Sequence, residues 1–552
     1  MTPDLAAAAT ALDAARGVCD AAARHLGALS ADDSGRISVE RLDRHQILAY
    51  DLAHAASGLE GGRVLLAYGE HGDHEARLAC LYVAEAIADL AGRTYGRSAQ
   101  WGIDNDALAP VGEFVEQHRS PAFLEAVAAG LEEGGTGPAH LPDDFELARD
   151  TFRRFAAEKI RPVAEHVHRA NDDIPEEVIS GLADLGGFGL SVPEEYGGFA
   201  GGGESDYLGM VVATEELCWG SLGVGGSLIT RPEILTRAIV RGGTDEQKAH
   251  WLPRIAGGEA MVGVMVTEPD YGSDVAGLKT TATRTPEGDW KLNGVKTWAT
   301  FAGRANTLMV LARTDPDRSA GHKGLSLFIV EKPEAPGHHF SFTQDAAGDE
   351  GGTVGRMEGR AIDTLGYRGM HSYEVSLEDW VVPAANIIGG EGGLGRGFYL
   401  QMEGFENGRL QTAARAVGLM QAAYEAAYDY ARERKVFGRA VLDYQLTQAK
   451  LARMAALVCG GRQVAYQVAR LMAKGEGALE ASMVKASVCR AAEWVTREAL
   501  QIHGGMGYAE EFPVSRYFVD ARVLSIFEGA DETLCLRLIA RRLAEGGLQE
   551  AG

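Results

Sequence analysis

QIHGGMGYAEEFPVSRYFVDARVLSIFEGADET, residues 501–533, is the stretch from which the organisation of this chain follows. It combines a glycine-rich turn, His503 to Gly507, with one carboxylate, Glu528, that stands among apolar neighbours directly before Gly529. Glycines let a backbone approach a ligand and present N–H groups to an anion. A carboxylate in apolar surroundings has its charged form disfavoured, which suits a proton acceptor near neutral pH. Taken alone, these residues are explained as well by a plain turn and a helix start.

Length and composition limit the classes of protein to consider. A chain of 552 residues is too long for one core and predicts about two to four domains. The net charge of −25 disfavours nucleic acid and anionic membranes as partners. We expect no membrane insertion, because no apolar run is long enough, and no signal peptide, because a basic leader is lacking. The six cysteines are scattered, which predicts buried thiols in a cytoplasmic protein and no metal site.

Apolar periodicity divides the chain into four parts. We predict a helical N-terminal extension at 1–141, an α-helical domain at 142–260, a β-domain at 261–390 and a C-terminal helical bundle at 391–552. The end of the extension, Pro110 to Pro142, is predicted to be a linker. Short β-branched runs in the β-domain indicate antiparallel strands, and Asn293-Gly294 predicts a type I′ hairpin turn.

The extension resembles part of the bundle. QILAYDLAHAASGLEGGR at 46–63 aligns without a gap with QLTQAKLARMAALVCGGR at 445–462, and 7 of 18 positions match. The matches include Gly-Gly-Arg at the same offset. We therefore predict that the extension is a partial copy of the bundle, with coincidence between two alanine-rich helices as the alternative.

Five separated motifs resemble those of the acyl-CoA dehydrogenase flavoprotein family. They are VTEPDYGSD at 266–274, KTWAT at 296–300, RKVFG at 434–438, QIHGGMGY at 501–508 and IFEGADET at 526–533. The resemblance covers about residues 142–548, in the family's order. It implies a mostly α fold with an inserted β-domain: an α-helical domain, a β-barrel domain and a C-terminal four-helix bundle, to which this chain adds its helical extension.

The resemblance implies FAD as a non-covalent cofactor. Nine residues match the family's cofactor-contacting positions: Thr267, Ser273, Trp298, Thr300, Arg434, Phe437, Gln501, Gly504 and Gly505. Those of the β-domain line the flavin, whose electronics depend on nearby donors. Those of the RKVFG motif reach the FAD of a neighbouring subunit, and the glycine turn lies against the pyrophosphate and adenosine part. Taken singly, Trp298 is equally explained as a core residue and Arg434 as half of a charge pair at a helix end.

Glu528 matches the family's catalytic base. The family stabilises the enolate oxygen of the thioester with the backbone N–H of the base residue and a ribityl hydroxyl of FAD. The base removes the α-proton while the β-hydrogen leaves as hydride to the flavin, which yields an α,β-unsaturated acyl-CoA. Some members carry the base on an earlier helix, where this chain has Gly408. The chain departs from the family at Ala530, usually Thr, and at Asp531-Glu532, where amides are common.

Four residues match substrate-binding positions: Arg231, Glu406, Arg409 and Gly529. Arg231 follows the helix that lines the acyl pocket, and a buried arginine there needs an anion. A terminal carboxylate of the substrate would serve, and so would a structural ion pair with Glu215, Glu216 or Glu233. Both explanations stay open.

The resemblance implies FAD-dependent α,β-dehydrogenation of a short, branched, dicarboxylic acyl-CoA, with electrons passed to an electron-transfer flavoprotein. A monocarboxylic substrate, oxygen as the acceptor, and a non-catalytic helical scaffold are the alternatives. Since members of the family commonly assemble through their bundles, the extension is expected to replace another subunit's bundle in cis, which predicts a homodimer.

Overall fold

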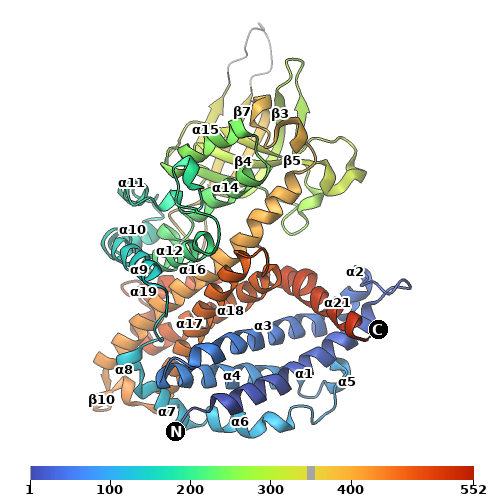
Figure 1. Cartoon of the computed structure of the whole chain (residues 1–552). Coiled ribbons are helices and arrows are strands. Elements are labelled where there is room, and N and C mark those ends of the chain that lie inside the picture. Colours follow the sequence, from blue (N-terminus) through green and yellow to red (C-terminus); the bar gives the residue numbers. More distant parts are fainter. Residues whose placement is uncertain (1, 345–354, 552) are drawn as a thin grey trace. The chain divides into compact units, whose positions relative to one another are not determined.

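The computed structural model describes residues 2–344 and 355–551 (Figure 1). The chain forms two compact units, one of Met1–Glu146 with Thr412–Gly552 and the other of Leu147–Gln411. The part of the predicted β-domain at 345–354 lies outside the described residues. Among the described residues, no helix is both long and apolar enough to cross a membrane. The predicted class, mostly α with an inserted β-domain, is confirmed.

The first unit contains the helices of the extension. Its long helices are α1 (Leu5–Ser30), α3 (Gln46–Gly69) and α4 (Asp73–Thr94). Asp4 caps α1 by accepting the N–H of Ala7 at 2.9 Å. The buried face of α1 is rich in alanine, and these small side chains allow α1 to lie close to α3. The core of the extension is therefore built from close helix packing.

The stretch from Pro110 to Pro142 is folded, so the predicted linker is wrong. It forms three short helices: α6 (Gly112–His118), α7 (Pro121–Ala129) and α8 (Leu131–Gly134). Phe123 and Val127 of α7 are fully buried, and α7 packs against the bundle. The prolines and glycines of this stretch suggested a linker, but Pro121 follows the N-cap Ser120 and starts a helix.

The C-terminal bundle completes the first unit. Its helices are α16 (Gly397–Glu433, whose first part belongs to the second unit), α17 (Gln445–Met472), α18 (Ala478–His503), α19 (Pro513–Leu524), α20 (Asp531–Thr533) and α21 (Ala540–Ala551). A π-helical turn, η12 (Leu534–Ile539), joins the last two. Helix α3 of the extension packs against α17, α18 and η12, as Figure 1 shows within this unit.

The second unit combines helices with a sheet. The helices are α9 (Asp143–Phe155, which begins in the first unit), α10 (Arg161–Ala170), α11 (Glu176–Asp184), α12 (Glu204–Gly220), α13 (Leu222–Gly225), α14 (Thr230–Gly242) and α15 (Asp245–Ala256). The strands are β1 (Val262–Met265), β2 (Thr281–Arg284), β3 (Trp290–Thr300), β4 (Thr307–Arg313), β5 (Leu325–Glu331), β6 (His339–Thr343), β7 (Arg356–Ile362) and β8 (Ser372–Val382).

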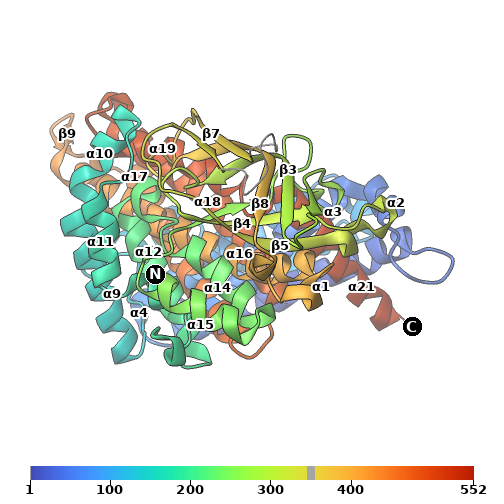
Figure 2. The same ribbon diagram turned by 90° about the horizontal axis from the view of Figure 1, so that it is seen from above.

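The strands form one eight-stranded sheet in the order β1-β4-β2-β3-β8-β7-β6, with β5 paired to β4. Strand β1 runs parallel to β4, so the sheet is mixed rather than wholly antiparallel as predicted. Apolar side chains of α14 and α15, among them Leu235 and Trp251, share a core with Met309 and Ile329 of β4 and β5 (Figure 2). These two helices therefore cover one face of that part of the sheet.

Asn293-Gly294 is not a hairpin turn, contrary to the prediction. The pair lies inside β3, where the pairing with β8 shifts register between Leu292 and Gly294. The Asn293 side chain donates to Asp379 at 3.0 Å, and a Cβ on Gly294 would lie 2.5 Å from the Thr280 hydroxyl. A bulge with a close neighbour explains the glycine, since bulges and tight turns call for the same residue.

Candidate active site

The turn that carries Glu528 is strained. Glu528 adopts φ of 53° and Gly529 φ of 97°, so both lie in the left-handed region. A non-glycine residue in that region costs about 1–3 kcal/mol and persists only when its surroundings hold it. Such residues concentrate at functional sites. The Glu528 side chain is partly buried. The feature that distinguishes Glu528 is its positive backbone φ angle.

Several contacts within the first unit fix this turn. Lys485 of α18 is fully buried and donates to the Gly529 carbonyl at 2.6 Å. The Asp531 N–H donates to the Ser525 carbonyl at 3.1 Å, which closes the turn, and the Ser525 hydroxyl donates to Glu493 at 2.5 Å. The sequence did not predict a role for Lys485. Its position inside the mostly apolar helical run Met483–Val488 was the one indication that this lysine is buried.

The glycine turn after α18 presents open backbone. Gly504 has φ of 61°, and a Cβ on it or on Gly505 would meet no atom within 4 Å. His503 supports the turn from behind, because its Nδ1–H donates to the Ala499 carbonyl at 2.8 Å and its ring stacks on Tyr430 at 4.3 Å. Burial holds the pKa of His503 below its ordinary value. The open space beside the two glycines therefore leaves room for a ligand to approach the backbone closely.

The RKVFG motif forms a tight hairpin that displays an aromatic ring. Strands β9 (Lys435–Val436) and β10 (Arg439–Ala440) pair around Phe437 and Gly438, whose φ values are 48° and 86°. Two consecutive positive φ angles are typical of a type I′ turn. The turn accounts for the positive φ of Phe437, but not for the choice of an aromatic residue whose surface is 99% exposed. A strained, exposed aromatic fits a contact with a ligand or with another copy of the chain.

The two β-domain motifs lie side by side. The Thr297 N–H donates to the Thr267 carbonyl at 2.9 Å, and the Thr300 hydroxyl lies 3.2 Å from that of Ser372. Trp298 has φ of 56° and is 55% exposed, so it is not a core residue. The core alternative for Trp298 is therefore wrong. Ser273, in the loop after Thr267, is exposed.

A buried ion pair anchors these motifs. Lys296 Nζ lies 2.9 Å from Glu268 and also donates to the Val266 carbonyl at 3.0 Å. Burial lowers the pKa of Lys296 to about 8 in spite of this pair. Because each motif contributes one partner, the pair fixes the backbone next to Thr267 and Trp298.

Arg231 lies in the first turn of α14 and is 7% exposed. Two of its three possible carboxylate partners pair with other arginines: Glu216 with Arg149 at 3.0 Å, and Glu233 with Arg237 at 2.9 Å. Glu233 also accepts from Asn407 of the FENGR motif, which brings that segment, with Glu406 and Arg409, next to α14. Since one carboxylate can pair with more than one arginine, as Glu216 does with Arg149 and Arg153, a structural ion pair and a substrate carboxylate both stay open for Arg231.

The predicted residues fall into two sets. The second unit holds Arg231, Thr267, Ser273, Trp298, Thr300, Glu406 and Arg409, and the first unit holds Arg434, Phe437, Gln501, Gly504, Gly505, Glu528 and Gly529. Trp298, Phe437 and Glu528 belong to the nine non-glycine residues with positive φ in the described part of the chain. Hydroxyl donors, exposed aromatic rings and glycines with open space beside them suit the parts of FAD. The residues therefore fit this cofactor.

Comparison with known proteins identifies relatives of the chain. Three family models match: the acyl-CoA dehydrogenase N-terminal domain at residues 142–259, the middle domain at 263–380 and the C-terminal domain at 395–544. The (2S)-methylsuccinyl-CoA dehydrogenase of Cereibacter sphaeroides is 38% identical over 534 residues, which cover 93% of each chain. Since the domain models begin at residue 142, this alignment must include much of the extension.

Solved structures resemble the part of the chain without the extension. Butyryl-CoA dehydrogenase from Megasphaera elsdenii has a TM-score of 0.64 and 30% identity, covering 72% of this chain and 97% of its own. Glutaryl-CoA dehydrogenase from Mycobacterium smegmatis, in complex with FADH2, has a TM-score of 0.62 and 26% identity, covering 75% of this chain and 96% of its own.

Proposed function

This chain belongs to the acyl-CoA dehydrogenase family, and we propose that it oxidises (2S)-methylsuccinyl-CoA to mesaconyl-CoA with FAD as its cofactor. The observation that carries the proposal is the alignment over 93% of the chain with a relative of that name. The butyryl-CoA enzyme, whose name gives another substrate, covers 72% of this chain, against 93% for the methylsuccinyl-CoA enzyme.

In this proposal Glu528 removes the α-proton of the thioester. Its backbone N–H donates to the developing enolate oxygen, so the strained φ serves to orient the carboxylate and the amide together. Lys485 holds the next carbonyl and thereby fixes the turn. Bound FAD would supply the acceptor for the β-hydrogen. Gly529 and the FENGR residues Glu406 and Arg409 contribute to binding of the acyl-CoA.

The FAD contacts are proposed from both sets of residues. Thr267, Ser273, Trp298 and Thr300 would line the flavin, and Gln501, Gly504 and Gly505 would contact the pyrophosphate and adenosine part. The exposed Arg434 and Phe437 suit the FAD of a second subunit, because a guanidinium can bind phosphate and the exposed ring is available for stacking. A homodimer is therefore part of the proposal. The extension would cover the bundle surface that other members use for further assembly.

Arg231 is proposed to bind the terminal carboxylate of the substrate. Arg231→Gln is expected to reduce kcat/KM for methylsuccinyl-CoA by about 100-fold, because a buried carboxylate loses its charge-assisted partner. For the monocarboxylic 2-methylbutanoyl-CoA, the same variant should lose much less kcat/KM. Arg241→Gln, at an exposed site on the same helix, is the matched control. Equal losses on both substrates would contradict the assignment.

An acyl-CoA panel tests the proposed function itself. Mono- and dicarboxylic, straight and α-branched thioesters are compared with an electron-transfer flavoprotein as the acceptor, while peroxide release measures any oxidase activity. Glu528→Gln should lower kcat by about 10²–10⁴-fold while the purified protein keeps its flavin absorbance. Full activity of this variant would show that another group is the base. A preference for a monocarboxylic thioester would overturn the substrate.

A further inference from the structure

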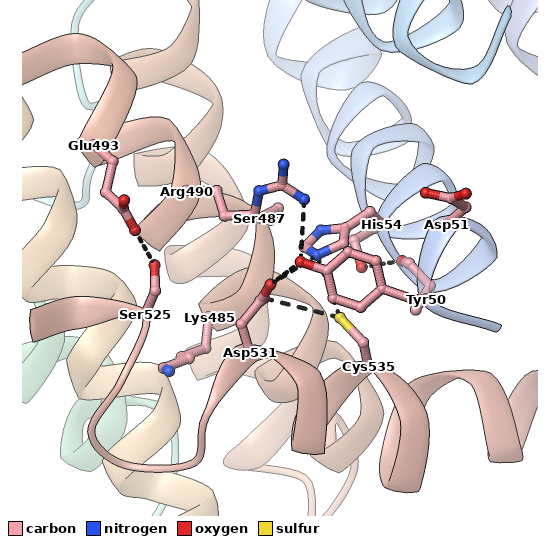
Figure 3. Close-up of polar contacts among 12 residues, drawn as sticks. Tyr50, Asp51, His54, Lys485, Ser487, Arg490, Glu493, Ser525, Asp531 and Cys535 are labelled. Atoms are coloured by element: carbon pink, nitrogen blue, oxygen red, sulfur yellow. Dashed lines mark hydrogen bonds and ion pairs between the residues drawn. The ribbon is translucent and has the colours of Figure 1, made fainter. Parts of the chain in front are cut away.

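Two residues of the extension contact the segment directly after the catalytic turn. Tyr50 and His54 lie four residues apart on α3, and both reach the carboxylate of Asp531, the first residue of α20 (Figure 3). The Tyr50 hydroxyl donates to Asp531 Oδ2 at 2.5 Å, and His54 Nε2 lies 3.1 Å from the same oxygen. The extension and the catalytic segment are thus joined by hydrogen bonds as well as by apolar packing.

Asp531 connects these contacts to the turn. Its N–H donates to the Ser525 carbonyl at 3.1 Å, so the backbone of Asp531 closes the loop that carries Glu528. The whole Asp531 residue is 7% exposed. Burial alone raises the pKa of Asp531, but the bonds from His54 and Tyr50 outweigh it and hold the pKa below its ordinary value. Asp531 is therefore an ionised acceptor in a buried place, and it needs both donors.

The strain at Glu528 makes such anchors necessary. A left-handed glutamate relaxes to an ordinary conformation unless its neighbours prevent it. Within the bundle, the anchors are Lys485 on the Gly529 carbonyl and the Asp531–Ser525 bond. The Asp531–Ser525 bond depends on the position of Asp531. Tyr50 and His54 of α3 hold Asp531 in that position. The extension therefore supplies one of the supports of the turn.

We propose that α3 of the extension positions the catalytic carboxylate, with Tyr50 and His54 as positioning residues that act through Asp531. The inference rests on the proposed role of Glu528 as the base. It also accounts for the acidic residue at position 531, for which the sequence offered no explanation.

The same cluster includes Cys535, and its geometry raises the question of a metal ion. Cys535 Sγ lies 3.4 Å from His54 Nε2 and 3.8 Å from Asp531 Oδ1. Burial, with the nearby Asp531 carboxylate, raises the pKa of Cys535, which favours the thiol over the thiolate that a metal needs. Asp531 Oδ2 already has two contacts with α3. Hydrogen bonding thus explains the cluster better than metal binding does.

The test compares Tyr50→Phe with Tyr68→Phe in the full-length holoenzyme. Both remove one hydroxyl from α3, but Tyr68 donates at 2.9 Å to the Pro138 carbonyl, within the extension. Tyr50→Phe and His54→Leu are expected to lower kcat for methylsuccinyl-CoA by roughly 10- to 100-fold with little change in KM, because the base is displaced. The deuterium isotope effect for the α-hydrogen should rise. His54→Gln keeps an N–H donor and should restore most of the activity.

Hydrogen exchange provides a readout that does not depend on turnover. Amides of 525–531 should exchange faster in Tyr50→Phe and His54→Leu than in Tyr68→Phe. If Tyr50→Phe matches Tyr68→Phe in kcat, isotope effect and exchange, the positioning role is wrong. If Glu528→Gln is active, the proposed function fails instead. Stoichiometric zinc in the wild-type protein that is absent from His54→Gln would also overturn the inference, in favour of a metal site.

Discussion

Helices α3 and α17 carry the same Gly-Gly-Arg sequence in different surroundings. Each begins at the glutamine where the two sequences align, Gln46 and Gln445. A Cβ on Gly61 of α3 would meet the Tyr82 ring of α4 at its hydroxyl, and a Cβ on Gly460 of α17 would meet the same ring at its carbons. One aromatic ring therefore fills the gap left by both glycines. The two helices thus use a glycine in the same way, while the origin of the extension as a partial copy of the bundle stays a prediction.

The arginine after each glycine pair shows where the two helices differ. Arg63 lies at the surface and pairs with Glu60 three residues earlier. Arg462 is 1% exposed and donates to Gln421 at 2.8 Å and to Thr136 at 3.2 Å. The comparison teaches that α3 and α17 share a means of packing, a glycine against one tyrosine ring, but differ in their polar contacts. Only the arginine of α17 is buried, where it bonds both Gln421 of the bundle and Thr136 of the extension.

The largest effect is expected from removing residues 1–141. The truncation exposes the faces of α17 and α18 that pack against α3, together with apolar surface. We expect an insoluble protein, or a tetramer formed through the uncovered bundles, where the full chain is a dimer. Light scattering after size-exclusion chromatography measures this directly. A soluble dimer of the truncated protein would show that the extension does not replace a subunit.

The sequence predicted what depends on local pattern. The order of helices and strands, the five motifs and the alignment of 46–63 with 445–462 all follow from periodicity and residue type. The strain at Trp298, Phe437 and Glu528 was not predictable, because a non-glycine residue gives no sign of a left-handed backbone.

Contacts between distant segments were also beyond the sequence. Tyr50 and Asp531 are 481 positions apart in the sequence. A tyrosine on a helix gives no indication in the sequence of such a distant partner. Pro121 and Gly294 were misread for a related reason. Proline and glycine mark a change of backbone, but a helix start and a linker, or a bulge and a hairpin, use the same residues.

The second largest effect is expected from replacing Arg462, with Arg63 as the comparison. Arg462→Met should lower the free energy of unfolding by about 2–4 kcal/mol, because Gln421 and Thr136 are left buried without this donor. Arg63→Met should change it by less than about 0.5 kcal/mol, since an exposed pair contributes little. Thermal and denaturant unfolding of the two variants measure the difference. Equal effects would mean that the burial of Arg462 has no energetic consequence.

The smallest effects are expected from substitutions of Gly61 and Gly460, which test how alike the packing of α3 and α17 is. An alanine in place of either glycine gains up to about 1 kcal/mol of helix propensity. At Gly460 the new Cβ would lie 2.4 Å from a ring carbon of Tyr82, which cannot move without shifting α4, so Gly460→Ala should destabilise by about 1–2 kcal/mol net. At Gly61 the nearest atom, 2.3 Å away, is the Tyr82 hydroxyl oxygen, which is fixed to the same rigid ring. Gly61→Ala should therefore also destabilise by about 1–2 kcal/mol, chiefly through the hydroxyl.

Tyr82→Phe separates these two cases. Removing the hydroxyl takes away the shortest contact at Gly61 and leaves Cζ at 2.9 Å, whereas the ring carbons at Gly460 stay in place. Combined with Tyr82→Phe, Gly61→Ala should become less destabilising, whereas Gly460→Ala should stay destabilising by the same amount. A double-mutant cycle on unfolding free energies measures both coupling terms. If the two cycles give equal coupling, the ring contacts both helices in the same way, and α3 and α17 are more alike than their glycine contacts indicate.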